Sequence, residues 1–273
     1  PVHLNEVIDN STFPANTAID RLVKGYMDKW AFHGAALAVS RNDTLIYAKG
    51  YGKADEGLPM EPGNIMRVAS VSKLITACAV IKLQEEVLLS VRDTVFGPRG
   101  ILNGELYSRS IGQKQFFDRI TVEHLLRHQG GFRGDPLFGI QNLMIANNKT
   151  APLTHDETIE GGLKGNLRFQ PGTSQRYSNL GYLLLCDIIE KVSGLPYSDY
   201  VIANVLAPAG IYDMHIGGNW YEDRRPNEVR HYTHEGDGKY IPDWRDTTLL
   251  TERSYGGNDI TLLSGAGGWT ASV

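Results

Sequence analysis

Two short polar motifs, each at the start of an apolar helical segment, constrain the fold of this chain more than any other feature. Ser70-Val71-Ser72-Lys73 opens one such segment, and Tyr177-Ser178-Asn179 follows the Pro171-Gly172 turn and opens another. In the first turn of a helix a serine hydroxyl lies near unpaired backbone N–H groups, and a lysine three positions later lies on the same face. A fold that uses both motifs must therefore bring two distant helix starts to one cleft.

The two motifs supply four side chains that suit acyl transfer through a serine ester. Ser70 offers a hydroxyl nucleophile and Lys73 an ammonium that can give up its proton, while Tyr177 offers a phenol and Asn179 an amide. Each motif alone also has a structural interpretation. A Ser-x-x-Lys match arises about once by chance in a chain of this size, and a tyrosine and an asparagine at a helix start can be a core aromatic residue and a cap. Only the occurrence of both motifs in one chain favours the catalytic interpretation over the structural one.

Composition argues against two classes of partner. The 27 basic and 31 acidic side chains among 273 residues give a net charge of −4 without a long run of either sign, so we expect no nucleic-acid partner. No apolar stretch approaches the roughly 18 residues that a membrane span needs, so we expect no span. The length suits one large domain or two interleaved lobes.

Hydrophobic spacing predicts several helices and one early hairpin. Ala36–Ser40 and Thr44–Ala48 are short apolar runs on either side of Arg41-Asn42-Asp43, a pattern typical of a β-hairpin, and Gly50-Tyr51-Gly52 is interpreted as a turn after it. The predicted helices cover residues 16–30, 70–86, 120–128, 154–163 and 179–192, with Asn16 or Thr17, Thr121, and Thr154 or Asp156 as candidate caps.

These elements predict an α/β (α+β) protein: an antiparallel sheet flanked by helices, with a mostly helical lobe inserted and a cleft between the two. We divide the chain into residues 1–84, the first part of the α/β lobe with the nucleophile helix; residues 85–204, the mostly helical lobe; and residues 205–273, an irregular return toward the α/β lobe. Strands that would complete the sheet are not evident after residue 205.

The helix that starts at Ser70 is expected to place a set of apolar residues near one face. These are Leu74, Ala77, Cys78, Ile81 and Leu83. Cys186 lies in another apolar helical segment. We therefore expect Cys78 and Cys186 to be two buried free thiols rather than a disulfide.

Several titratable residues have a structural interpretation. His124 and His128 could act as bases, but lone helix histidines are more often structural, and we assign both to packing. A further group near the end of the chain has spacings that match no zinc or calcium loop, so we interpret it as a polar surface loop and expect no metal. This group consists of His231, His234, Asp237 and Asp243.

Three segments taken together resemble the serine β-lactamase and penicillin-binding family, in the class C branch that is shared with D,D-peptidases and β-lactamase-like esterases. They are Val68–Lys73, Ile120–Gly131 and Pro171–Tyr182, and Asp259–Ala271 is similar to a further segment of that branch. The resemblance covers about residues 15–273 and is far more specific than any single motif. It implies a β-lactamase/transpeptidase-like fold.

The resemblance also implies roles for individual residues. Ser70 would be the acylated nucleophile, and its backbone N–H would form half of the oxyanion hole. Lys73 would take part in deprotonating Ser70. Tyr177 would act as general acid in acylation and help to activate the deacylating water, and Asn179 would orient the substrate amide.

The sequence departs from the family pattern at the third motif, a Lys- or His-containing triad that ends in Gly on a strand lining the cleft. That strand normally lies well after the Ala266-Gly267-Gly268 segment and supplies the second oxyanion N–H, whereas this sequence ends at Val273. Two segments match the residue types of this motif, His215-Ile216-Gly217 and His234-Glu235-Gly236. Both lie before the Ala-Gly-Gly segment in the chain, so we assign the motif to neither. We expect it on a C-terminal portion outside this sequence or on a separate C-terminal fragment, and we expect the chain alone to be inactive.

The leading hypothesis is a serine hydrolase that works through an acyl-enzyme on β-lactams or related amides and esters. A small-ester carboxylesterase and a D-alanyl-D-alanine peptidase are the alternatives, and a penicillin-binding or sensor domain without turnover is the alternative from another class. No glutamate is placed as a class A deacylation base, which favours the tyrosine-based branch. The resemblance further implies a small-molecule substrate, no cofactor and a periplasmic or secreted bacterial protein.

Overall fold

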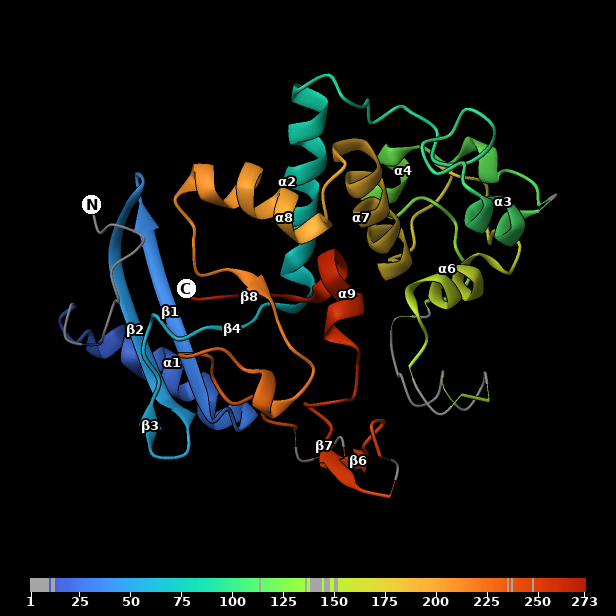
Figure 1. Ribbon diagram of the computed structural model, residues 1–273. Coiled ribbons are helices and arrows are strands. Elements are labelled where there is room, and N and C mark those ends of the chain that lie inside the picture. Colours follow the sequence, from blue (N-terminus) through green and yellow to red (C-terminus); the bar gives the residue numbers. More distant parts are fainter. Residues whose placement is uncertain are drawn as a thin grey trace.

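A long β-hairpin and a group of packed helices form the two sides of the molecule, and short strands lie between them (Figure 1). The computed structural model describes residue 10 and residues 13–112, 114–135, 137, 144, 148–149, 152–234, 236, 238–246 and 248–273. The strands are β1 Gly34–Arg41, β2 Thr44–Asp55, β3 Leu58–Pro59, β4 Met66–Arg67, β5 His215–Ile216, β6 Tyr240–Pro242, β7 Leu250–Glu252 and β8 Trp269–Ala271. The α-helices are α1 Thr17–Trp30, α2 Ser72–Glu85, α3 Glu105–Ile111, α4 Val122–Leu126, α6 His155–Leu163, α7 Asn179–Ser193, α8 Tyr197–Val201 and α9 Ile260–Gly267.

The described strands form three antiparallel groups, in the orders β1-β2-β3, β4-β8-β5 and β6-β7. The predicted mixture of antiparallel sheet and helices is confirmed. The division of the chain at residues 84 and 204 stays a prediction.

The hairpin forms where the sequence predicts it, but its second strand is longer than expected. Asn42 and Asp43 both have positive φ angles, 52° and 57°, which suit the tight turn of a twisted hairpin. The interpretation of Gly50–Gly52 as a turn was wrong, because β2 continues through these glycines to Asp55. A Cβ at Gly50 would lie 1.9 Å from the carbonyl oxygen of Met60, so the glycine lets the chain after β3 pack directly against β2.

A single carboxylate fastens α1 to the hairpin. Asp20 Oδ1 accepts hydrogen bonds from Tyr47 Oη at 3.2 Å, Lys49 Nζ at 3.1 Å and Tyr51 Oη at 2.9 Å. The N-terminus of α1 is capped by Asn16, whose side chain accepts from two backbone N–H groups, as predicted. Asp20 therefore lies on the side of α1 that faces β2.

The main core lies on the helical side, around α7. Ten residues of α7 are buried, and the helix ends at Gly194 in the left-handed conformation. Trp269 of β8 is fully buried at the centre: its backbone N–H donates to Ser72 Oγ at 3.1 Å and its Nε1–H to Tyr197 Oη at 2.9 Å. These contacts join β8 to the first turn of α2.

The expected apolar face of α2 is only partly buried. Leu83 is fully buried, but Leu74 and Ile81 are 63% and 41% exposed and Cys78 is exposed. The helix instead turns its polar side, with Lys73 and Thr76, into the protein. Both cysteines are free, as predicted, and Cys186 is buried. The expectation that Cys78 is buried was wrong, because α2 packs by the side that carries the lysine.

Candidate active site

Ser70 lies on a short 3₁₀ turn, Ala69–Val71, that leads directly into α2. Ala69 has a positive φ of 46°, a conformation that costs a residue with a Cβ about 1 kcal/mol. The turn is held from β8, where the Trp269 carbonyl accepts from the N–H of Val68 at 3.0 Å. The side chain of Ser70 is thereby presented at the surface while the turn beneath it is fixed.

Lys73 is 6% exposed and has three hydrogen-bond acceptors around its Nζ. Nζ donates to the carbonyl of Ala266 at 2.5 Å, to Asn179 Oδ1 at 2.7 Å and to Ser70 Oγ at 3.4 Å. An ammonium has three hydrogens to donate, so the arrangement accommodates the charged form without an unpaired donor. The Ala266 carbonyl belongs to α9, which places the Ala-Gly-Gly segment at the lysine.

Tyr177 and Asn179 lie at the start of α7, and both contact Lys73. Tyr177 Oη donates to Ser70 Oγ at 2.7 Å, and its half-exposed ring lies 4.6 Å from Lys73 Nζ. Asn179 is 1% exposed. The helix cap is Ser178, whose Oγ accepts from the N–H of Gly181, so the alternative in which Asn179 caps the helix is excluded. The structure thus brings all four predicted site residues together.

The two candidate histidine bases have structural partners. His124 Nδ1 accepts from the backbone N–H of Thr121 in a capping box, which confirms the predicted cap of α4. His128 Nδ1 accepts from the N–H of Ser178, and its ring lies 4.5 Å from the ring of Tyr177. Burial, assisted by the charge of Lys73, lowers the pKa of His128, so its imidazole stays neutral. His128 therefore packs against the tyrosine ring as a neutral side chain.

The sequence reasoning missed one side chain in the site. Asp135, in the loop after Gly130-Gly131, accepts from both the backbone N–H and the Nδ2 of Asn179, at 3.0 and 2.7 Å. Its position after a glycine pair in a loop carries no periodic signal, so only a family-wide comparison of that loop could have singled it out.

The two segments whose residue types match the third motif, at His215 and His234, lie outside the candidate site. His215, on β5, is buried and its described partners are the Asp213 carbonyl and Glu228. His234 is exposed and accepts from the N–H of Gly236. Neither has a described contact with Ser70, so the assignment of the third motif to neither is supported.

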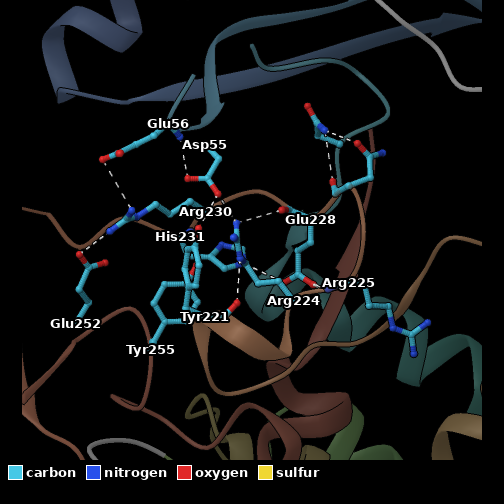
Figure 2. Close-up of polar contacts among 12 residues, drawn as sticks. Asp55, Glu56, Tyr221, Arg224, Arg225, Glu228, Arg230, His231, Glu252 and Tyr255 are labelled. Carbon is cyan, nitrogen blue, oxygen red and sulfur yellow. Dashed lines mark hydrogen bonds and ion pairs between the residues drawn. The ribbon is translucent and has the colours of Figure 1, made fainter. Parts of the chain in front are cut away.

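Figure 2 shows a buried network around Glu228 that the sequence reasoning also missed. The side chain of Glu228 is 1% exposed; its Oε1 lies 3.1 Å from His231 Nε2, its Oε2 lies 3.7 Å from His215 Nε2, and the N–H of Arg225 donates to it at 3.1 Å. Burial raises the pKa of this carboxyl, but the two histidines and the N–H outweigh burial and leave its pKa well below the usual range. Burial also lowers the pKa of His231.

The charged arginine of β4 lies near this network. Arg67, three residues before Ser70, donates from Nη1 to the Ser254 carbonyl at 2.6 Å and from Nη2 to the Gly218 carbonyl at 2.8 Å. Burial lowers its pKa, and the nearby carboxylates of Glu228 and Asp223 oppose that change. Arg67 therefore ties β4, the strand that leads into the nucleophile turn, to the backbone at Gly218 and Ser254.

The four residues of the candidate metal group do not come together in the described part of the chain. His231 belongs to the Glu228 network, and Asp243 pairs with Arg245 Nη2 at 2.7 Å. His234 contacts its own loop, and Asp237 lies outside the described residues.

The helices in the described part of the chain include none with the length and apolar character that a membrane span needs.

Known proteins match this chain in sequence and in structure. The family model described as Beta-lactamase matches residues 19–273. Penicillin-binding protein 4* of Bacillus subtilis (strain 168) is 30% identical over 247 residues, which cover 88% of this chain and 49% of that protein. The octameric penicillin-binding protein homologue from Pyrococcus abyssi superposes with a TM-score of 0.67 at 28% identity, over 94% of this chain and 53% of the other.

A more distant structure shares the fold alone. The D-amino acid amidase from Ochrobactrum anthropi SV3 has a TM-score of 0.66 at 20% identity, over 94% of this chain and 67% of the other. The chain spans about half the length of the curated relatives that it matches. The resemblance inferred from the motifs is confirmed: the chain belongs to the Beta-lactamase family of serine hydrolases.

Proposed function

We propose that this chain is a serine hydrolase that works through an acyl-enzyme on β-lactams or related amides and esters. One observation carries the proposal: Ser70 Oγ lies 2.7 Å from Tyr177 Oη and 3.4 Å from Lys73 Nζ. A hydroxyl with two proton-transfer groups within reach is what nucleophilic catalysis requires. The exposure of Ser70 leaves room for a substrate carbonyl on its outer side.

In acylation, Ser70 Oγ forms a bond to the substrate carbonyl carbon as the C–N or C–O bond of the substrate breaks. Once Lys73 has given up a proton, its Nζ is the acceptor for the serine proton. Tyr177 passes a proton to the leaving nitrogen or oxygen, and the backbone N–H of Ser70 stabilises the carbonyl oxygen as it gains negative charge.

In deacylation, water attacks the serine ester, and the Tyr177 phenolate left by acylation takes a proton from that water. The bond between the carbonyl carbon and Ser70 Oγ breaks, Lys73 returns its proton to Oγ, and the acid is released. Asn179 Oδ1 is engaged by Lys73, and one Nδ2 hydrogen is engaged by Asp135. We assign the second Nδ2 hydrogen to the substrate amide carbonyl. Tyr177 is 51% exposed, which allows it to reach both the leaving group and the water.

β-Lactams rank first among the candidate substrates, small esters second and D-alanyl peptides third. The relatives from Bacillus subtilis and Pyrococcus abyssi are named as a penicillin-binding protein and a homologue of one, which supports a β-lactam. A structure titled EstCE1, a hydrolase with promiscuous acyltransferase activity, shares the fold at 19% identity. We therefore retain a small ester as a candidate substrate.

Intact-mass spectrometry of the intact gene product after exposure to benzylpenicillin tests the proposal. We expect an adduct of the drug's mass on Ser70 that decays with release of opened drug. Ser70→Ala should form no adduct, and Ser108→Ala, at an exposed serine of α3, should behave as wild type. A parallel assay with short-chain nitrophenyl esters tests the esterase alternative.

The outcomes separate the hypotheses. A persistent adduct favours a sensor domain or a slow peptidase, and ester cleavage without an adduct favours an esterase. Absence of both reactions refutes the enzyme. Unchanged activity in Ser70→Ala refutes the nucleophile.

We infer that the protein works in the periplasm or outside the cell on a small-molecule substrate. Relatives such as penicillin-binding protein 4* are bacterial, and β-lactams and D-alanyl peptides are found outside the cytoplasm. The net charge of −4 gives no basis for binding nucleic acid. Fractionation of the native host, with activity assayed in each fraction, tests the location.

We also propose that a further β-structured segment covers the outer edge of β1 and the exposed face of α2. Within the described residues, no strand pairs with that edge of β1. On α2 and the turn before it, Val71, Leu74 and Ile81 are 62%, 63% and 41% exposed, and together they form an apolar surface suited to a covering segment. We assign the segment to the same gene product, with a separate C-terminal fragment as the alternative.

Leu74→Glu in the intact gene product tests this coverage. A charge on a covered face should stop adduct formation on Ser70, because the segment can no longer seat. Val87→Glu, at a position that is 89% exposed and lies after the end of α2, should leave the rate unchanged. Equal adduct rates in the two variants contradict the coverage.

A further inference from the structure

Asp135 is held at the start of α7 by two neighbouring loops. The loop that precedes it is joined to the segment before Tyr177 by backbone hydrogen bonds: Arg168 N–H to the Gly131 carbonyl at 2.7 Å and Arg176 N–H to the His128 carbonyl at 2.9 Å. Through Oδ2, the carboxylate accepts from the Asn179 backbone N–H at 3.0 Å and from Asn179 Nδ2 at 2.7 Å. Oδ2 of Asp135 therefore contacts both the backbone at the start of α7 and the side chain of Asn179.

The side-chain bond decides which way the amide of Asn179 points. An asparagine amide can present either its oxygen or its nitrogen on a given side, whereas an ionised carboxylate can only accept. With Nδ2 held by Asp135, Oδ1 must face Lys73, and Nζ donates to it at 2.7 Å. A flipped amide would put an NH₂ group against the ammonium.

We propose that Asp135 is a positioning residue that fixes the amide orientation of Asn179 and, through it, holds Lys73 Nζ within reach of Ser70. The inference rests on the proposed function of the same site. Asp135 has no described contact with Ser70 or Lys73, so its effect passes through Asn179.

The two bonds that Asp135 accepts from Asn179 have separable consequences. The bond to the backbone N–H stabilises the first turn of α7 whatever side chain residue 179 carries. The bond to Nδ2 matters only while the asparagine is present. A double-mutant cycle with Asn179→Ala therefore distinguishes a positioning role from a merely structural one.

The experiment measures the rate of Ser70 acylation by benzylpenicillin or p-nitrophenyl butyrate in Asp135→Ala, Asp135→Asn, Asn179→Ala and the Asp135→Ala/Asn179→Ala double variant. Asp135→Ala should lower the rate roughly 10- to 100-fold, the range for a hydrogen bond to a charged group. Asp135→Asn, which keeps one acceptor, should lie between it and wild type. In the Asn179→Ala background the same Asp135→Ala change should alter the rate less than about 3-fold.

The melting temperature provides the second readout. It should fall on Asp135→Ala in both backgrounds, because the backbone bond is present in both, and it should fall further where the Nδ2 bond is also lost. Asp199→Ala, which removes another carboxylate from the first turn of a helix, α8, should leave the acylation rate unchanged. Equal fold-losses of rate in the two backgrounds overturn the positioning role.

A readout without turnover keeps this inference separate from the proposed function. In ¹⁵N NMR spectra the Asn179 side-chain NH₂ pair, identified by its absence in Asn179→Ala, should shift in Asp135→Ala and shift less in Asp135→Asn. Absence of acylation in wild type with this shift present refutes the function but supports the positioning. An unmoved NH₂ pair overturns the positioning, whatever the activity.

Discussion

Glu228→Gln should lower the free energy of unfolding more than the loss of any exposed charge, because this carboxylate lies at the centre of the buried network near β4. Its side chain is 1% exposed, and its oxygens face two histidines at 3.1 and 3.7 Å. The substitution keeps the shape of the side chain but removes the charge. The buried Arg67 and His231 would then lie near a neutral amide.

The size of the effect follows from the burial. A buried hydrogen bond to a charged group contributes about 1.5–3 kcal/mol, and the Glu228 carboxylate accepts more than one. Glutamine can still accept hydrogen bonds, so we expect a loss of about 2–3 kcal/mol at pH 7. Glu222→Gln is the matched control: its side chain is 61% exposed and pairs with Arg245, and its loss should stay below about 1 kcal/mol.

The pH dependence gives a second test of the same reasoning. The pKa of Glu228 is depressed in the folded state, so its contribution is fully present above the unfolded value of 4.5 and is lost as the pH falls toward the folded pKa. The gap between wild type and Glu228→Gln should therefore shrink below about pH 4.5. His231 also has a lowered pKa and destabilises both proteins as the pH falls below 6.5.

Urea unfolding followed by tryptophan fluorescence at pH 7, 5 and 3.5 measures these free energies. The reasoning fails if Glu228→Gln costs no more than Glu222→Gln at pH 7. It also fails if the gap between wild type and Glu228→Gln stays constant down to pH 3.5.

Three further predictions concern other parts of the chain. A hydrogen bond to Asp187, together with smaller effects, raises the pKa of His155 to about 9. Wild type should therefore be more stable than Asp187→Asn by about 1 kcal/mol below pH 6.5, and this difference in the free energy of unfolding should fall as the pH rises through 9. A difference that grows with pH in thermal melts contradicts the prediction. Iodoacetamide should alkylate the exposed Cys78 in the native protein and Cys186 only after unfolding, and equal labelling by mass spectrometry refutes the packing of α2. Gly25→Ala, inside α1 with nothing within 4 Å of the new Cβ, should stabilise the fold by about 0.5–1 kcal/mol in urea titrations, and a loss would show that the site is not open.

Most helix starts were predictable because their signals are local. Asn16, Thr121 and Thr154 cap the helices for which they were candidates, and the last two do so in capping boxes. A cap depends on a side chain and on backbone N–H groups two or three residues away, so a single sequence contains the whole interaction. The turn at Asn42 and Asp43 was predictable for the same reason.

The buried face of α2 and the extent of β2 were not predictable, because distant segments decide them. Leu74 and Ile81 have a core-like pattern but are exposed, while Lys73 turns inward because Asn179 and Ala266 offer acceptors there. Gly50 looks like a turn glycine, yet its role is to let the Met60 backbone approach a strand. In both cases the partner is a residue that no local pattern names.

The sequence by itself determined the chemical groups of the site and the elements that carry them: Ser70 and Lys73 at the start of one helix, Tyr177 and Asn179 at the start of another. Only the tertiary structure decided that these starts meet, that Tyr177 lies 2.7 Å from Ser70 Oγ, and that Asp135 selects the orientation of the Asn179 amide. The physical reason is that composition and spacing govern interactions within a few residues. Distances across a cleft depend on how α2, α7 and α9 pack around a shared core, which every part of the chain helps to determine.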